Sequence, residues 1–151
     1  MESKLLKTLI VKSPKFENNG RIPPKYTCDG DEVNPPLTIE GLPKETKSLV
    51  LIIDDPDASS GTWNHWLVWN IPPTTKIKEN TVPGTQGVNT SGKHAYDGPC
   101  PPSGTHRYFF KVFALDVKLN SNPNSRKEDV EKAMMGHIMA EGELLGLYRR
   151  V

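Results

Sequence analysis

The chain has 151 residues, which is the usual size of a single domain, so we expect one domain over residues 1–151. Nineteen Lys and Arg against eighteen Asp and Glu give a formal net charge of +1, which excludes a general attraction to nucleic acid or to an anionic membrane surface. Fourteen prolines and twelve glycines, spread between apolar runs, are typical of a turn-rich β protein.

The N-terminal residues do not have the pattern of a signal peptide. Residues 1–11 contain an apolar stretch that is interrupted by Lys7, and no small-residue cleavage site follows it. No run in the chain approaches the roughly twenty uncharged apolar residues of a membrane span. We therefore expect a cytoplasmic protein without an integral membrane segment.

Six segments have the apolar runs or the alternation expected of β-strands. They are residues 5–11, 37–40, 48–54, 63–71, 108–115 and 138–145. Residues 48–54 contain consecutive large aliphatic side chains, which predicts a strand buried on both faces. Lys7 lies on one apolar face of the first segment and indicates an edge strand. Residues 13–36 are rich in Asn, Gly, Pro and Asp, so we expect an irregular segment that packs over the strands.

One helix is predicted late in the chain. Ser125 and Glu128 have the spacing of a capping box, and the apolar residues after them recur at helical intervals until Gly136. For residues 138–145 a helix is nearly as compatible with the pattern as a strand, and we predict a strand. Antiparallel strands with a single late helix indicate a mainly β fold, a two-sheet antiparallel β-sandwich with one or two short peripheral helices.

A polar corner follows the predicted strand at residues 48–54. Pro56 has no N–H to donate, so the strand ends there and leaves Asp55 at its open end. Strict alternation in the next strand places Trp63, His65, Leu67 and Trp69 on one face and Asn64, Trp66 and Val68 on the other. His65 can then lie beside Asp55. If the corner binds an anion, Asp55 either raises the pKa of His65 and favours an imidazolium that donates to the anion, or takes up a proton itself, or meets a cationic part of the ligand such as an ammonium.

A second group of candidate residues lies at the start of the strand at residues 108–115. His106 falls on the same face as Tyr108 and follows the proline-rich and glycine-rich segment 98–104. Imidazole and phenol groups donate hydrogen bonds to anions, and the main chain at Gly98 can approach a ligand closely. Binding sites are commonly built at such strand ends and loops on a rigid scaffold.

The two polar segments together resemble a known family. Asp54–Ser59 and Gly98–Phe110 are similar, in order and spacing, to the two signatures of the phosphatidylethanolamine-binding protein family, in its small bacterial and archaeal branch that is often called Raf-kinase-inhibitor-like. Shorter similarities extend over most of the chain, at residues 22–30, 35–37 and 136–148. Ser59 stands where the family usually has a second proline, so we expect a less rigid turn there.

The resemblance implies a fold of two antiparallel sheets with peripheral helices and a small anion-binding pocket. The family positions of that pocket fall on Asp55, Trp63, His65, Gly98, His106 and Tyr108. The family includes phospholipid head-group binders, inhibitors of kinase pathways and, in some members, protease inhibitors. We therefore expect a non-enzymatic binding module for a phosphate-type anion or phospholipid head group, with a kinase or protease as protein partner. No cofactor or metal is implied, and small bacterial relatives are often homodimers.

An enzyme remains the alternative. Asp55, His65 and His106 are residue types that could hold zinc in a metal-assisted hydrolase of a small phospho or acyl substrate, although they match no local metal motif. Ser59 or Ser103 could serve a serine hydrolase, but the chain has no G-x-S-x-G motif to expose a nucleophile.

Two further expectations concern side-chain partners. Cys28 and Cys100 are the two cysteines of the chain, lie far apart and lack a C-x-x-C spacing, so two small buried thiols are expected, with their pairing left open. Arg107 is expected to pair within the protein, through a bidentate contact with Asp57 or Asp54.

Overall fold

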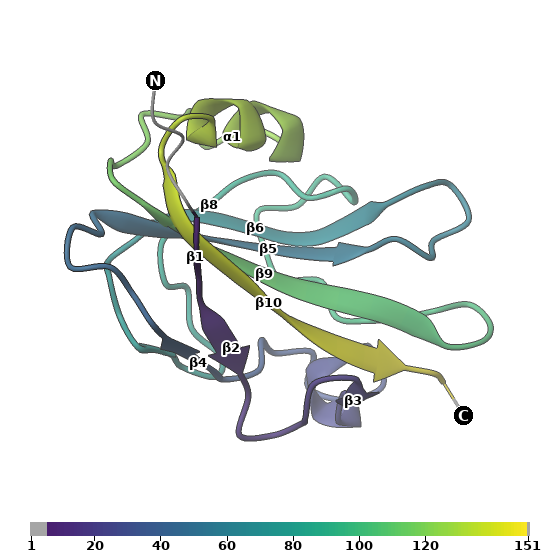
Figure 1. Ribbon diagram of the computed structural model, residues 1–151. Helices are drawn as coiled ribbons and strands as arrows, with labels where there is room; N and C mark the ends of the chain where they lie inside the picture. Colours follow the sequence, from purple (N-terminus) through teal and green to yellow (C-terminus); the bar gives the residue numbers. More distant parts are fainter. Residues whose placement is uncertain (1–5, 151) are drawn as a thin grey trace.

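The computed structural model describes residues 6–150 and has two β-sheets and one α-helix (Figure 1). The larger sheet has seven strands in the order β1-β10-β9-β5-β6-β8, with β3 also paired to β10, and the smaller sheet has the order β2-β4-β7. The strands are β1 (Lys7–Thr8), β2 (Ile10–Lys12), β3 (Gly20–Arg21), β4 (Leu37–Glu40), β5 (Ser48–Asp55), β6 (Trp63–Ile71), β7 (Lys76–Ile77), β8 (Thr85–Gln86), β9 (His106–Leu115) and β10 (Ile138–Tyr148). The prediction of a mainly β, two-sheet fold is confirmed.

Strand β5 is the centre of the larger sheet, between β6 and β9, and every residue in it is buried. Leu49, Leu51 and Ile53 join the apolar cluster between the two sheets. Val50 and Ile52 point to the opposite face, where they belong to a second cluster with helix α1 (Lys127–Met134). Figure 1 shows α1 on one side of the large sheet and the small sheet on the other. The uninterrupted aliphatic run therefore follows from burial on both faces.

Helix α1 is found where it was predicted, but its N-terminus differs. The Oδ2 atom of Asp129 accepts a hydrogen bond of 3.0 Å from the backbone N–H of Arg126, which is the N-cap residue. The predicted capping box of Ser125 and Glu128 is therefore wrong by one residue, because Asp129 and not Glu128 stands three positions after the cap. Lys127 also holds the helix to the sheet through a 2.6 Å ion pair with the buried Asp54.

Strand β10 confirms the prediction of a strand after Gly136. It pairs antiparallel with β9 along its whole length, from Ile138 opposite Leu115 to Tyr148 opposite His106. A side chain at Gly142 would place Cβ 2.1 Å from the carbonyl oxygen of Leu9, so glycine lets the N-terminal segment approach the strand. Pairing with a distant strand therefore decided between two local structures that the pattern allowed.

The predicted first strand is divided in two. Strand β1 pairs in parallel with β10 at the edge of the large sheet, and β2 pairs antiparallel with β4 at the edge of the small sheet. The edge position of Lys7 is confirmed, and Leu5 lies outside the described residues. Leu9 and Val11 are buried between the sheets, because the chain crosses from one sheet to the other here.

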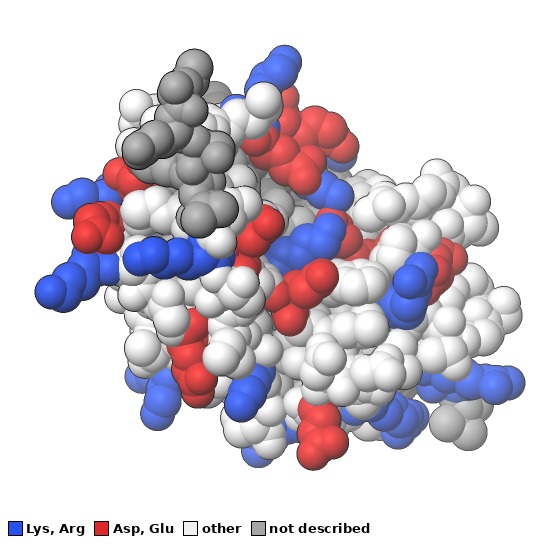
Figure 2. All heavy atoms as spheres, viewed as in Figure 1, with Lys and Arg blue, Asp and Glu red and all other residues white. Residues whose placement is uncertain are grey.

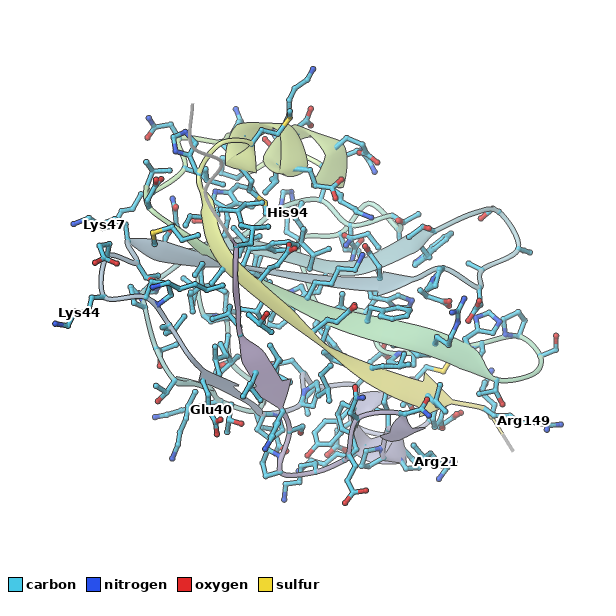
Figure 3. All side chains as sticks on the ribbon, in the orientation of Figure 1. Arg21, Glu40, Lys44, Lys47, His94 and Arg149 are labelled. Atoms are coloured by element: carbon cyan, nitrogen blue, oxygen red, sulfur yellow. A yellow bond between two sulfur atoms is a disulfide. The ribbon has the colours of Figure 1, made fainter. Side chains whose placement is uncertain are left out.

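The irregular segment after β2 packs over the sandwich as expected. It contains β3 and the 3-10 helix η1 (Pro24–Tyr26), and it buries Phe16, Ile22 and Tyr26 in the central cluster. Figure 3 shows side chains filling the space between the sheets, while the labelled Lys44, Lys47 and Arg149 point outward. Within residues 6–150 no helix is both long and apolar enough to cross a membrane.

Candidate ligand-binding site

A cavity of about 410 Å³ lies at the end of the large sheet where β5 stops and β9 begins, on the right of Figure 1. The six predicted site residues all line it: Asp55, Trp63, His65, Gly98, His106 and Tyr108. The remaining wall comes from the loop after β5, from the segment around Pro101 and from Cys28 and Glu32. Residues that are distant in sequence therefore meet in one concave site.

Asp55 and His106 form the closest polar pair of the cavity. The Oδ2 atom of Asp55 lies 2.7 Å from Nδ1 of His106, and its Oδ1 atom accepts a 2.7 Å hydrogen bond from the backbone N–H of Asp57. Asp55 is buried, so both oxygens are held by these partners rather than by bulk water. Because the carboxylate can only accept, Nδ1 of His106 carries the proton and Nε2 is the other ring nitrogen. Asp55 thus bonds to His106, while His65, which was predicted to lie beside Asp55, lines the same cavity.

His65 reaches the cavity through an irregularity in β6. The register shifts from Ile53 opposite Trp66 to Asp54 opposite Asn64, so that His65 is an extra residue without its own partner on β5. The imidazole of His65 packs edge-on against Tyr108, with ring centroids 5.3 Å apart, and Trp66 joins the same central cluster as Tyr108. The predicted strict alternation is wrong here, because a β-bulge turns two neighbouring side chains to one side.

The surroundings of His65 also reverse the predicted direction of its pKa shift. Its Nδ1–H donates a 2.9 Å hydrogen bond to the carbonyl oxygen of Asp97, and the side chain is buried. Burial disfavours the charged form and lowers the pKa of His65, outweighing the hydrogen bond to Asp97 and the negative charge of Asp55. His65 is therefore a neutral imidazole at neutral pH.

Tyr108 presents an unsatisfied hydroxyl group. It is 1% exposed, and its hydroxyl oxygen is buried without a hydrogen-bond partner among residues 6–150. Burial, the nearby charge of Asp55 and a side-chain contact with its carboxylate raise the pKa of Tyr108 far above its ordinary value, so the phenol keeps its proton. Its ring also stacks loosely on His106, with centroids 6.5 Å apart. The cavity wall thus contains a buried donor whose hydrogen bond is not satisfied in good geometry, although Asp55 lies near it.

Arg107 is confirmed as a structural anchor. Its guanidinium makes two 2.9 Å hydrogen bonds to the carboxylate of Asp57, and its backbone N–H donates to the same carboxylate at 2.9 Å. Asp54, the other predicted partner, pairs instead with Lys111 and Lys127 on the opposite face of the sheet. The Asp57–Arg107 contact joins the loop after β5 to the start of β9, and it helps to hold Asp55 and His106 in place.

The two cysteines are paired, so the expectation of two buried thiols is wrong. Cys28 and Cys100 form a disulfide with their Cα atoms 5.4 Å apart, at the wall of the cavity. The backbone N–H of Cys28 donates a 3.1 Å hydrogen bond to the carbonyl of Pro99, which brings the two segments together. Their separation of 72 residues leaves no local signature of the pairing in the sequence.

The comparisons with known proteins agree with this fold. The family model described as phosphatidylethanolamine-binding protein matches residues 12–149. The chain belongs to the phosphatidylethanolamine-binding protein family. A UPF0098 protein of Methanothermobacter thermautotrophicus is 51% identical over 148 residues, which cover 93% of this chain and 98% of that protein.

Two solved structures of family members are similar to this one. CT736 from Chlamydia trachomatis, named as a homologue of phosphatidylethanolamine-binding protein, is 40% identical with a TM-score of 0.92 and covers 96% of this chain and 99% of its own. YbcL from Escherichia coli, named as a new member of the mammalian family, is 30% identical with a TM-score of 0.86 and covers 95% of this chain and 99% of its own. The bacterial and archaeal membership that the two signatures indicated is thereby established.

Among the cavity-lining residues that were not predicted as site residues, Cys28, Glu32 and Asp97 make contacts that shape the wall. Cys28 and Glu32 lie in the irregular segment 13–36, and Asp97 directly precedes the second signature. The carbonyl of Asp97 orients His65, while the Oε2 atom of Glu32 accepts a 3.1 Å hydrogen bond from the backbone N–H of Gly98. Only the position of Asp97 beside the signature could have drawn attention to it.

The alternative hypothesis of a metal-assisted hydrolase requires a group of metal ligands around Asp55, His65 and His106. In the part of the chain that the structure describes, no three His, Cys, Asp or Glu side chains are grouped so that they could hold a metal ion. The Nδ1 atoms of His65 and His106 bond to Asp97 and Asp55, respectively.

Proposed function

We propose that the cavity binds a small phosphate-type anion, either free or as the head group of a phospholipid, without chemical turnover. The observation that carries this proposal is the buried hydroxyl of Tyr108, which lies near Asp55 but makes no hydrogen bond of good geometry among residues 6–150. Buried polar groups are nearly always hydrogen-bonded, so an unpartnered donor at a cavity wall indicates that a ligand supplies the acceptor. A volume of about 410 Å³ lies in the usual range for small-molecule sites.

The two histidines can complete the coordination of a phosphate-type group. Asp55 bonds to Nδ1 of His106, which leaves Nε2 of His106 for a ligand. In a protonated His106, Nε2–H would donate a charge-assisted hydrogen bond to that ligand. A protonated His106 and an ionised Asp55 together carry no net charge. Binding therefore depends on hydrogen-bond donors at fixed positions in the cavity wall and not on a basic surface. Neutral His65 can accept a hydrogen bond from a protonated phosphate oxygen.

The charge distribution on the surface agrees with a local mode of binding. Figure 2 shows Lys and Arg interspersed with Asp and Glu over the visible face, as expected for a net charge of +1. The loops that border the cavity carry small and uncharged residues such as Ala58, Ser59 and Ser60. An anion would therefore be recognised inside the cavity and not by long-range attraction.

Binding without catalysis is supported by the positions of the two candidate nucleophiles. Ser103 is not among the residues that line the cavity. Ser59 does line it but is exposed. A nucleophilic serine needs a hydrogen bond to its general base, and no such bond to Ser59 or Ser103 is present in residues 6–150. Because the chain belongs to this family, we also propose that it regulates a kinase or a protease as its protein partner. We further propose that it does so in the cytoplasm.

The test compares two tyrosine variants by titration calorimetry with phenylphosphonate. Tyr108→Phe removes an unpartnered hydroxyl, so we expect unchanged or slightly higher stability and at least roughly tenfold weaker binding. Tyr148→Phe is the matched control, because the Tyr148 hydroxyl already donates a 2.6 Å hydrogen bond to Asp29 and does not line the cavity. This control should lose stability and keep its affinity. Equal affinity of Tyr108→Phe and wild type would contradict the proposal, as would catalytic release of phosphate from phenyl phosphate.

A further inference from the structure

One backbone donor at the cavity wall already has a carboxylate partner. Gly98 is buried and lines the cavity, and its N–H donates to the Oε2 atom of Glu32 at 3.1 Å. An anionic ligand at this wall would seek the same donor, since backbone N–H groups beside glycine commonly bind anions. A carboxylate oxygen of the chain itself accepts from this donor.

The backbone around Glu32 is arranged for this contact. Glu32 has φ of 57°, which is uncommon for a residue other than glycine, and its N–H donates a 2.9 Å hydrogen bond to the carbonyl of Lys25. A Cβ atom built on Gly98 would lie 2.9 Å from Cγ of Glu32, so the glutamate side chain is packed against the bare main chain. The Cys28–Cys100 disulfide fixes the two segments beside each other.

Glu32 differs from the other carboxylates of the cavity in its partners. Asp55 bonds to His106, and Asp97 bonds to Ser91 and forms an ion pair with Lys93. No Lys, Arg or His among residues 6–150 forms an ion pair with Glu32, whose bond to Gly98 uses a neutral donor. Glu32 is also exposed to solvent, so its flexible side chain can leave the wall without a large loss of burial.

We propose that Glu32 is an internal competitor of the anionic ligand, a gate that holds the Gly98 N–H until a ligand displaces it. This inference rests on the proposed function of the cavity. The negative charge of Glu32 near the ligand opposes a dianion more strongly than a monoanion, because the repulsion scales with the product of the charges. Glu32 therefore lowers the affinity for phosphate-type ligands and shifts the preference of the site toward singly charged ones.

The test measures affinities of full-length wild type, Glu32→Gln and Glu32→Ala by titration calorimetry at pH 8. The probes are phenylphosphonate, as the doubly charged anion, and benzenesulfonate, as a singly charged anion of similar shape. We expect both variants to bind phenylphosphonate roughly tenfold more tightly than wild type, the size of one charge-assisted hydrogen bond, with a smaller gain for benzenesulfonate. Asp31→Asn is the matched control, because it removes one neighbouring exposed charge outside the cavity lining. Its affinity should equal that of wild type.

The outcomes separate this inference from the proposed function. One outcome is that phenylphosphonate binds wild type, that Tyr108→Phe weakens this binding, and that the Glu32 variants bind no more tightly than wild type. In that case the proposed role of Glu32 is wrong, while the proposed binding site is supported. A gain in affinity from Asp31→Asn as large as from Glu32→Gln also refutes the gate, since general charge then explains the effect. If neither wild type nor the Glu32 variants bind, or if Tyr108→Phe has no effect in any background, both proposals fail. As an independent readout, the amide resonance of Gly98 should move in Glu32→Ala and move further on addition of phenylphosphonate.

Discussion

The imidazole of His106 and the carboxylate of Asp55 meet at 2.7 Å although they are 51 residues apart in sequence. Asp55 is the last residue of β5 and His106 the first of β9, and these two strands are antiparallel neighbours in the large sheet. The pairing of two long, apolar strands therefore sets the distance between two polar groups at their ends. The orientation of His106 follows from this contact.

The first prediction is that Asp55 and His106 are energetically coupled. His106→Ala leaves a buried carboxylate oxygen without its partner, which should lower the free energy of unfolding by about 1–3 kcal/mol. Asp55→Ala should cost a similar amount, while the double variant should cost less than the sum by about 1–3 kcal/mol. Urea unfolding of the four proteins measures this cycle, and strictly additive losses would show that the pair makes no interaction of its own.

The second prediction concerns pH and His65. Burial lowers the pKa of folded His65 below its ordinary value of 6.5. Below pH 6.5, His65 is therefore protonated to a larger extent in the unfolded chain than in the folded protein. The contribution of His65 to the free energy of unfolding should therefore be constant above pH 6.5 and should decrease as the pH falls below it.

The matching experiment compares urea unfolding at pH 7.5 and 5.5 for wild type and His65→Gln. The variant should lose less stability between the two pH values, because its buried side chain does not titrate. His94→Gln is the control, since it makes the same substitution at an exposed histidine. An identical loss of stability in wild type and His65→Gln would contradict the prediction.

The third prediction is that the disulfide stabilises the fold and the cavity wall. It joins residues 72 positions apart, so the Cys28→Ser, Cys100→Ser double variant should lose about 2–4 kcal/mol of unfolding free energy. Wild type in reductant should approach the stability of this variant, and the variant itself should not respond to reductant. Alkylation of two free thiols in wild type purified without reductant would refute the pairing. Disulfides are typical of oxidising compartments and also of intracellular proteins from hyperthermophiles, so the cytoplasmic location stays a prediction.

The fourth prediction concerns assembly through the N-terminal edge. Strand β2 is the outer strand of the small sheet, and Ile10 on it is 47% exposed. An open strand edge with an apolar side chain favours pairing with a second copy, in line with the expected homodimer. We expect light scattering to give the mass of two chains for wild type and of one chain for Ile10→Lys, with unchanged circular dichroism. The mass of one chain for wild type at working concentration would remove this prediction.

The sequence by itself determined the long strands of the large sheet, β4, and six residues of the cavity wall. The bounds of β4 and β6 and the doubly buried β5 follow from local apolar runs and from prolines, which act within a few residues. The six predicted residues lie around one cavity. They could be identified from sequence because strand ends next to proline-rich loops are recognisable in short segments. Family resemblance added the connection between two such segments that no local pattern contains.

The tertiary structure alone decided which of these groups touch. The β-bulge at His65 depends on the register between β5 and β6, and that register is set by packing across the whole strand. The choice of His106 as partner of Asp55, the disulfide of Cys28 with Cys100 and the contact of Glu32 with Gly98 all join distant segments. Burial in turn determined the direction of the pKa shift of His65, since desolvation depends on the atoms that surround the ring and not on its neighbours in sequence.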